Sequence, residues 1–529
     1  MAWGSGAFNS CDKLLERVEK NDPTLKELVV LPMKTFGAKD LDRLSHAIGE
    51  YRIEIKGDYD IFIGFFHLWH KHWCLLTCVY FFVYNQIYMS TETGMNTHLV
   101  SISASGHPLP PNSLKAFGNA LSIQASKQQK YGITSLAIGS KDMGDEGTIA
   151  LCQGLALSNG ALLQHLDLGW KEIGKDGLYE IGTTFVHSKC LRELDLSRND
   201  FGNDGIVQLS KGAAAAAAAA EHDDDAAGVA FPALEQLILS ECNIDSTGMD
   251  VLAKILLGQE KDKRQRSKRI HLAIGSNPFG SAGCHSLVQL LSCVDHGSVI
   301  SHLQAAQCSI GNGGVEILSQ GFHRGLEIMD ISDNGITTDG AKKLAASLSQ
   351  SWPDLVEMKI AKNEIGSDGV SAILGSLITR GDTNDSTESG KNSSLQNLDL
   401  SYTNCGAEGA KAALRSGGLH SLRLFGNTIG SDGFDAIAPL LRGGHPNIEN
   451  LDLGGNNAEE DSVVRLLDSI ADKKDASAHS RLAVLEIGGN KFGDKAMEAL
   501  TRLQSVWPDL DVAHDKPVGE SGWKEEDQD

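Results

Sequence analysis

One short phrase recurs between residues 136 and 496, and it limits the possible folds more than any other feature of the chain. The phrase reads apolar-x-apolar, a polar step, Asn or a substitute, an apolar residue followed by Gly, and a further Gly, as in LDLGWKEIGKDG at 166–177. Twelve copies are clear, and their first apolar residues, called starts below, are Leu136, Leu166, Leu194, Leu237, Leu272, Leu303, Met329, Met358, Leu398, Leu422, Leu451 and Leu485. Such repetition is typical of a solenoid, in which stacked repeats bury one shared core.

The spacing of the starts and the residue five positions later define the repeat. Neighbouring starts are 24 to 43 residues apart, and the basic unit is about 28 to 29 residues, at the long end of the leucine-rich range. The fifth position holds Asn in seven of the twelve copies, and its amide is expected to bond to the backbone of the adjacent coil. The occupants, called ladder residues below, are Lys141, Lys171, Asn199, Cys242, Asn277, Cys308, Asn334, Asn363, Thr403, Asn427, Asn456 and Asn490.

Each repeat predicts one strand and one helix. The apolar-x-apolar step has the period of a strand with one buried face. Ten of the twelve copies carry Gly eleven residues after the start, where we expect a Cβ to crowd the neighbouring coil. Apolar residues then follow at helical spacing, as in 340–348. Two fainter repeats, near Val29 and Val100, precede the clear ones.

This pattern resembles the ribonuclease-inhibitor type of leucine-rich repeat, which also occurs in NACHT-type immune receptors and in Ran GTPase-activating proteins. The resemblance covers about residues 96–512. It implies an α/β solenoid, the leucine-rich repeat horseshoe, with parallel strands on the concave side and helices on the convex side. We therefore expect an N-terminal cap and first weak repeat in 1–50, an anomalous insert in 51–95, the solenoid in 96–512 and an acidic disordered tail in 513–529.

The charge and cysteine content suggest the kind of partner and the compartment. The net charge of −22 argues against binding to nucleic acid or anionic membranes and favours a basic partner. The ten cysteines show no paired spacing, and no secretory signal follows Met1. A reducing compartment, the cytosol or the nucleus, is therefore expected.

Residues 51–95 break the rhythm of the repeat. The stretch 61–84 is long enough for a membrane span, but the HKH at 70–72 lies in its middle, where charge is expensive. Its histidines and cysteines match no zinc spacing well. Removing 51–90 shortens the interval from Val29 to Val100 from 71 to 31 residues, close to one repeat. A retained intron translated in frame is our hypothesis, and a genuine insertion that associates with membranes is the alternative.

Three further low-complexity stretches lengthen individual repeats. They are the alanine run with its acidic end at 213–225, the basic run at 261–269 and the Ser/Thr-rich stretch at 381–394. Each falls after an expected helix and before an expected strand. The basic run is interpreted either as a nuclear-import signal or as a solvated loop.

The sequence contains no convincing catalytic motif. GWKEIGKD at 169–176 resembles a phosphate-binding loop but lacks the Ser or Thr that would hold magnesium, and the repeat already explains its glycines. No nucleophile elbow or metalloprotease motif is present. The chain is therefore expected to be non-enzymatic and to use no metal or cofactor.

The residues expected to point outward from the strands are the candidates for binding. The position after the start is often acidic, but acidic residues are common there in this repeat type. The more individual residues are Trp170, Arg198, Glu241, Asp333, Lys362, Tyr402 and Phe425. Exposed aromatic and Arg side chains are frequent anchors of interfaces. The sequence therefore predicts a scaffold that binds another protein on its concave face. The alternatives are a GTPase-activating protein of the Ran type and a sensor tethered to a membrane through 61–84.

Overall fold

The structure is a computed structural model that describes residues 11–31, 34–49, 96, 98–127, 132–160, 162–219, 230–258, 268–292, 298–321, 323–377, 394–416, 418–472 and 480–515. The chain divides into two compact units. Unit 1 consists of Met1–Glu193 and Lys211–Ala219, and unit 2 consists of Leu194–Ser210 and Ala220–Asp529.

In unit 1, strands and helices alternate along the chain. Its strands are parallel and pair in sequence order, β1 with β2, β2 with β3 and β3 with β4. The elements are α1 (Asp12–Glu19), β1 (Glu27–Val29), α2 (Ala38–Gly49), β2 (Ser101–Ser105), α4 (Pro111–Lys127), β3 (Ser135–Gly139), η1 (Lys141–Met143), α5 (Gly144–Leu155), η2 (Ala156–Ser158), β4 (His165–Asp167) and α6 (Lys175–Phe185).

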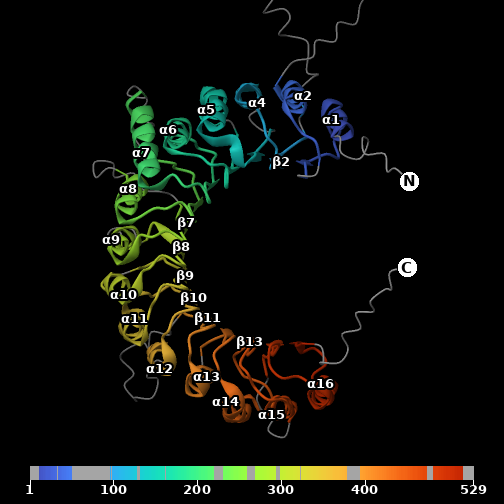
Figure 1. The fold of residues 1–529 in the computed structure, drawn as a ribbon, viewed down its shortest axis with the longest axis vertical. Coiled ribbons are helices and arrows are strands. Elements are labelled where there is room, and N and C mark those ends of the chain that lie inside the picture. The colour runs from blue at the N-terminus through green and yellow to red at the C-terminus, as the bar shows by residue number, and fades with distance from the viewer. Residues whose placement is uncertain are drawn as a thin grey trace, which may run out of the picture. The chain divides into compact units, whose positions relative to one another are not determined.

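Unit 2 continues the same alternation. Figure 1 shows its strands along the inner side of a curve and its helices along the outer side, so unit 2 has the expected architecture of an α/β leucine-rich repeat solenoid. Its elements are β5 (Glu193–Asp195), α7 (Gly202–Ala219), β6 (Gln236–Ile238), α8 (Ser246–Leu257), β7 (Ile270–Ala273), α9 (Gly280–Leu291), β8 (Ile300–Gln304), α10 (Gly311–Ser319), β9 (Ile328–Asp330), α11 (Thr338–Ser351), β10 (Glu357–Lys359), α12 (Gly366–Leu377), β11 (Asn397–Asp399), α13 (Gly406–Leu414), β12 (Ser421–Arg423), α14 (Gly430–Ile437), η3 (Ala438–Leu441), β13 (Asn450–Asp452), α15 (Glu460–Ala471), β14 (Val484–Glu486), α16 (Asp494–Val506) and β15 (Asp511–Ala513). Two of these elements are divided between the units, because Glu193 of β5 and Lys211–Ala219 of α7 belong to unit 1.

The starts read from the sequence align across neighbouring strands. Leu237 pairs with Leu272, and the alignment continues without a shift from Leu272 through every following start to Leu485. All of these residues are buried, and together they form the apolar core between strands and helices. The two fainter repeats differ from expectation, because the paired and buried residues are Leu28 and Ile102. Val29 and Val100 are exposed instead.

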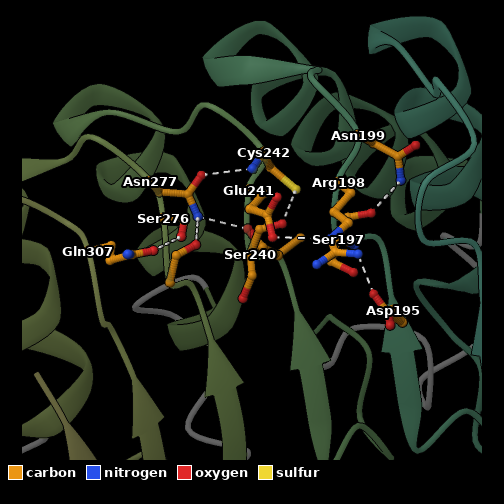
Figure 2. Close-up of polar contacts among 12 residues, drawn as sticks. Asp195, Ser197, Arg198, Asn199, Ser240, Glu241, Cys242, Ser276, Asn277 and Gln307 are labelled. Carbon is orange, nitrogen blue, oxygen red and sulfur yellow. Dashed lines mark hydrogen bonds and ion pairs between the residues drawn. The ribbon is translucent and has the colours of Figure 1, made fainter. Parts of the chain in front are cut away.

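The ladder asparagines join each coil to the one before it. In Figure 2 the side chain of Asn277 lies between its own coil and the coil that carries Cys242. Its amide nitrogen donates to the carbonyls of Leu239 in the preceding coil and Ile274 in its own coil, both at 2.8 Å. Its amide oxygen accepts from the backbone N–H groups of Cys242 and Ile244. A fully buried amide therefore satisfies four backbone groups that water cannot reach. The same bridge recurs at Asn334, Asn363, Asn427, Asn456 and Asn490.

Two cysteines replace ladder asparagines, as the sequence suggested, and they keep part of the bridge. The thiol of Cys242 donates to the Leu196 carbonyl and that of Cys308 donates to the Ile274 carbonyl, each at 3.3 Å from the preceding coil. Burial raises the pKa of each thiol to about 12. Both side chains therefore stay protonated and act as small buried donors.

Two close contacts explain why the residue eleven positions after the start is glycine. A Cβ on Gly340 would lie 2.4 Å from Oδ1 of Asn312 in the preceding coil and 2.8 Å from Cγ2 of Ile336 in its own coil. Asn312 uses that oxygen to accept the N–H of Thr337 at 2.9 Å, just before α11 begins. The preceding helix thus supplies an N-terminal cap. The expected crowding of the neighbouring coil is present, and the sequence did not reveal the cap.

The inserted stretches fall at the same place in the repeat along the chain. The ranges 50–95, 220–229, 259–267 and 378–393 lie outside the described residues, and each falls between a helix and the next strand. The alanine run forms the end of α7, which reaches Ala219. At the described end of the basic run, Lys268 is paired with Glu235, and Arg269 contacts Glu327 at 3.2 Å. Within the described residues, no helix is long and apolar enough to cross a membrane, and 61–84 falls outside them.

The residues on either side of 50–95 form a complete turn. The N–H of Asn96 donates to the carbonyl of Ala47 at 3.0 Å, and its side-chain oxygen accepts from the N–H groups two and three residues later. In an uninterrupted coil, Ser188 makes the same bonds to Phe185 and to the residues that follow it. Asn96 therefore occupies the place of a residue three positions after Ala47.

We expect a chain with Gly49 joined directly to Asn96 to fold as the full chain does. Leu28 and Ile102 are 74 residues apart, and removing the 46 residues of 50–95 leaves 28, the interval from Leu166 to Leu194. Thermal unfolding should show an apparent Tm within about 2 °C of the full chain, because no described contact is lost. A deletion of the same length that removes 100–145, which contains β2 and β3, is the control and should not fold. A clear loss of stability in the 50–95 deletion would contradict the interpretation that 50–95 is inserted into a complete repeat.

Replacing a ladder amide by Ala should destabilise unit 2 by about 2–4 kcal/mol, because buried backbone groups lose their partners. Asn363 suits this test, since it is 1% exposed and bonds to Ile331, Ile360, Asn334 and Ile336. Asn363→Cys, which imitates the natural substitution in two other coils, should lose less. Denaturant titration measures the free energy of unfolding of both variants. Equal losses would argue that a hydrogen bond to the carbonyl of the preceding coil does not stabilise unit 2.

Candidate protein-binding surface

The acidic position after each start has a local structural role. In five coils an Asp there accepts the N–H two residues later at 2.8–2.9 Å, which fixes the bend at the end of the strand. These residues are Asp167, Asp195, Asp330, Asp399 and Asp452. Their presence is therefore explained by the fold, although their second carboxylate oxygens still add negative charge to the strand face.

A column of side chains follows the strands of unit 2, one position before each of the seven ladder residues from Asn199 to Thr403. All of these residues have φ between +54° and +59°, the left-handed region in which a side chain costs roughly 1–2 kcal/mol. We call them the loop column: Arg198, Glu241, Ser276, Gln307, Asp333, Lys362 and Tyr402. The sequence selected five of them as binding candidates but gave no sign of their backbone conformation.

Neighbouring members of the loop column contact one another. Figure 2 shows Arg198 beside Glu241, and Ser276 beside Gln307. Nε of Arg198 lies 3.1 Å from Oε1 of Glu241, Ser276 donates to Gln307 at 2.8 Å, and the Gln307 amide donates to Asp333 at 2.8 Å. Exposed pairs of this kind contribute only about 0–1 kcal/mol. They therefore arrange the side chains without offsetting the cost of their backbone conformation.

The C-terminal end of the loop column carries an aromatic pair. The rings of Tyr402 and Phe425 meet edge to face with centroids 5.4 Å apart. A Cβ on Gly426 would lie 2.5 Å from the Tyr402 ring, and one on Gly454 or Gly455 would lie 2.8–2.9 Å from the Phe425 ring. Each ring thus rests on glycine backbone in the next coil. Tyr402 is still 49% exposed, so the pair offers a firm apolar contact surface.

Charged groups on the strand face lie beside the aromatic pair. Burial raises the pKa of Asp452, and the carboxylates of Glu486 and Asp399 raise it further, against the opposing effects of the Gly454 N–H and of Arg423. Arg423 lies 3.9 Å from Asp399. The carboxylates outnumber this one base, so the strand face here is acidic.

The other candidates are placed singly. Trp170 belongs to unit 1, is 59% exposed and has φ of +55°, so it occupies the position equivalent to the loop column. Lys362 is exposed, and its backbone N–H bonds to Ser401. The structure thus brings Arg198 together with Glu241, and Tyr402 together with Phe425. Ser276 and Gln307 were not predicted, and only their equivalence in the repeat could have pointed to them.

No group of three or more His, Cys, Asp or Glu side chains is arranged to hold a metal ion among the residues that the structure describes. The His67, His70, His72, Cys74 and Cys78 set lies outside them.

The comparisons with known proteins point to one class. A family model described as leucine-rich repeat matches residues 187–210, 325–345, 391–412 and 419–438. Ribonuclease inhibitor of Sus scrofa is 27% identical over 276 residues, which cover 46% of this chain and 55% of that protein. The Mus musculus inhibitor is 24% identical, over 54% of this chain and 56% of that protein. The human NACHT, LRR and PYD domains-containing protein 5 is 27% identical over 41% of this chain and 16% of its own length.

The strand register, the ladder and these similarities identify a leucine-rich repeat protein similar to ribonuclease inhibitor. The matched part spans about half the length of the two inhibitors and a smaller share of the NACHT receptor. Leucine-rich repeat proteins of this type bind protein partners.

Asp452→Asn should raise the Tm at pH 7. The pKa of Asp452 is raised in the folded chain, so the folded state loses stability as pH rises from the usual carboxyl pKa through the raised value. Asn cannot ionise, and its side-chain oxygen can still accept the Gly454 N–H. The gain should therefore disappear near pH 3, where Asp452 is protonated in both states. Thermal melts at the two pH values measure this, and a lower Tm for the variant at pH 7 would contradict it.

Proposed function

We propose that the chain is a non-catalytic interaction scaffold and that its partner protein binds unit 2 over the loop column and the adjacent strand face. The observation that carries this proposal is the aromatic pair of exposed Tyr402 and half-buried Phe425, which rests on glycine backbone beside acidic side chains. Aromatic side chains that are held rigidly lose little entropy on binding, and such residues often dominate interface energies.

The partner is expected to present a basic surface. Support comes from the net charge of −22 and from the strand face of unit 2, which carries Asp195, Asp330, Asp399, Asp452 and Glu486 against Lys359 and Arg423 at the position after the start. Opposite charges speed association and select against acidic proteins. By their names, two of the relatives inhibit ribonucleases, so a ribonuclease is one protein that a binding assay can include.

Trp170 is proposed as a separate contact on unit 1. Its exposed ring and its left-handed backbone match those of Tyr402. Because it belongs to the other unit, its contribution is best tested alone rather than as part of one surface.

The two alternatives gain no support from the described residues or from the relatives reported above. A GTPase-activating protein would need a catalytic side chain, and no repeat position supplies one by motif. The proposed tether lies in 61–84, outside the described residues. Stimulation of Ran GTP hydrolysis by the purified chain would overturn the non-catalytic proposal.

The variant Tyr402→Ala/Phe425→Ala should weaken binding about 10- to 100-fold, as expected for the loss of a central aromatic anchor. Proteins captured from cell extract by the immobilised wild-type chain are identified by mass spectrometry. The most enriched protein is then purified, and its Kd is measured by calorimetry for each variant. Binding should also weaken with rising salt if the partner is basic.

Tyr179→Ala is the matched control, because Tyr179 is an exposed aromatic residue on the helix α6 and not on the strand side. It should bind as the wild type does, and both variants should keep their melting behaviour. Equal capture by the wild type and the Tyr402/Phe425 variant, or equal loss in the control, would contradict the proposed surface.

A further inference from the structure

Left-handed backbone recurs at three positions of the strand-to-helix loop in unit 2. They lie four, six and eight residues after the start. At the eighth position, every residue with positive φ is glycine: Gly202, Gly280, Gly311, Gly366, Gly406 and Gly430. Glycine is the residue that this conformation favours, because it has no Cβ.

The sixth position also follows the preference of the backbone. Its residues with positive φ are Asn243, Ser309, Gly335, Asn404, Thr428 and Asn457. Glycine and Asn, the two residues that visit this region most readily, occupy four of the six sites. The other two carry only short polar side chains. At these two positions the residue type is explained by folding alone.

The fourth position follows this preference at only three of its ten sites in unit 2. The other seven hold the loop-column members, which include Arg, Glu, Gln, Lys and Tyr. Tyr402 packs against Phe425. Contacts within the column do not explain the polar members, because the Arg198–Glu241 pair is about half exposed and surface pairs contribute little. No described contact therefore requires the long polar side chains.

Glycine does appear at the fourth position in the last three coils, as Gly426, Gly455 and Gly489. At two of these glycines, the absence of a side chain leaves space for an aromatic ring. The Tyr402 ring lies against Gly426, and the Phe425 ring lies against Gly455. At Gly426 and Gly455 an aromatic ring from the preceding coil thus covers the fourth position, whereas Gly489 packs against the backbone of Gly455.

We propose that the loop column is retained for recognition at the expense of stability, and that its long side chains determine which partner is bound. This inference rests on the proposed function and deepens it. Non-glycine residues held in left-handed conformations cluster at sites whose geometry serves binding. The aromatic pair anchors the basic partner protein, and the polar members from Arg198 to Lys362 select it by hydrogen bonds and charge.

The test compares strain relief inside and outside the column. The variant Glu241→Gly/Lys362→Gly removes two column side chains and their strain. Its matched control, Ser309→Gly/Thr428→Gly, relieves the same kind of strain at the sixth position. Both should raise the apparent Tm by about 1–3 °C. Only the column variant should lower affinity for the protein captured by the wild-type chain, by about tenfold or more.

A third variant separates strain from contact. Glu241→Ala/Lys362→Ala removes the same side chains and keeps a Cβ at positive φ, so its Tm should stay near that of the wild type while its affinity falls as in the glycine variant. The inference is overturned if the column glycine variant melts lower than the wild type, or if its affinity is unchanged. If Tyr402→Ala/Phe425→Ala weakens binding in the same assay while Glu241 and Lys362 do not matter, the proposed surface stands and only the selective role of the column fails. If neither matters, both proposals fail.

Discussion

The ladder amides are the interaction on which the rest of unit 2 depends. The strands of unit 2 are only three to five residues long. Each Asn adds side-chain bonds to the coil before it, as Asn363 does to the carbonyl of Ile331 and to the N–H groups of Asn334 and Ile336. Because these backbone groups are buried, leaving one without a hydrogen-bond partner costs free energy. Each Asn therefore positions its own coil against the coil before it.

The ladder also determines which residues are exposed at the end of each strand. To place its side chain inside, the chain must turn sharply at the end of each strand, and in most coils of unit 2 it does so with left-handed backbone at the preceding residue. That residue is then exposed at the edge of the strand face. Each buried ladder residue is therefore preceded by an exposed residue. The side chains at these exposed positions form the loop column.

Much of the fold could be read from the sequence because one residue type serves one function at a fixed interval. The starts, the ladder and the helix glycines were found in register, since burial leaves few residues that fit. The two fainter repeats were misplaced by one or two residues, because Val29 and Val100 are as apolar as the buried Leu28 and Ile102. The site was predicted only as single residues. The contacts of Ser276 and Gln307 between coils, and the packing of Phe425 on Gly454 and Gly455, involve neighbours 26 to 31 residues away, which no local pattern reveals.

The two edges of unit 2 differ in how much length they tolerate. From the start to the first helical residue, every coil uses 8 or 9 residues, whereas the step from a helix end to the next strand varies from 5 to 20. The first segment carries the ladder, the loop column and the residue before the helix, whose N–H the preceding helix caps in the case of Thr337, so an added residue would break several bonds at once. The second segment carries no ladder or loop-column residue, and the additional residues 220–229 and 378–393 fall in it along the chain. Differences in length and in the loop column can therefore arise at different places in the repeat.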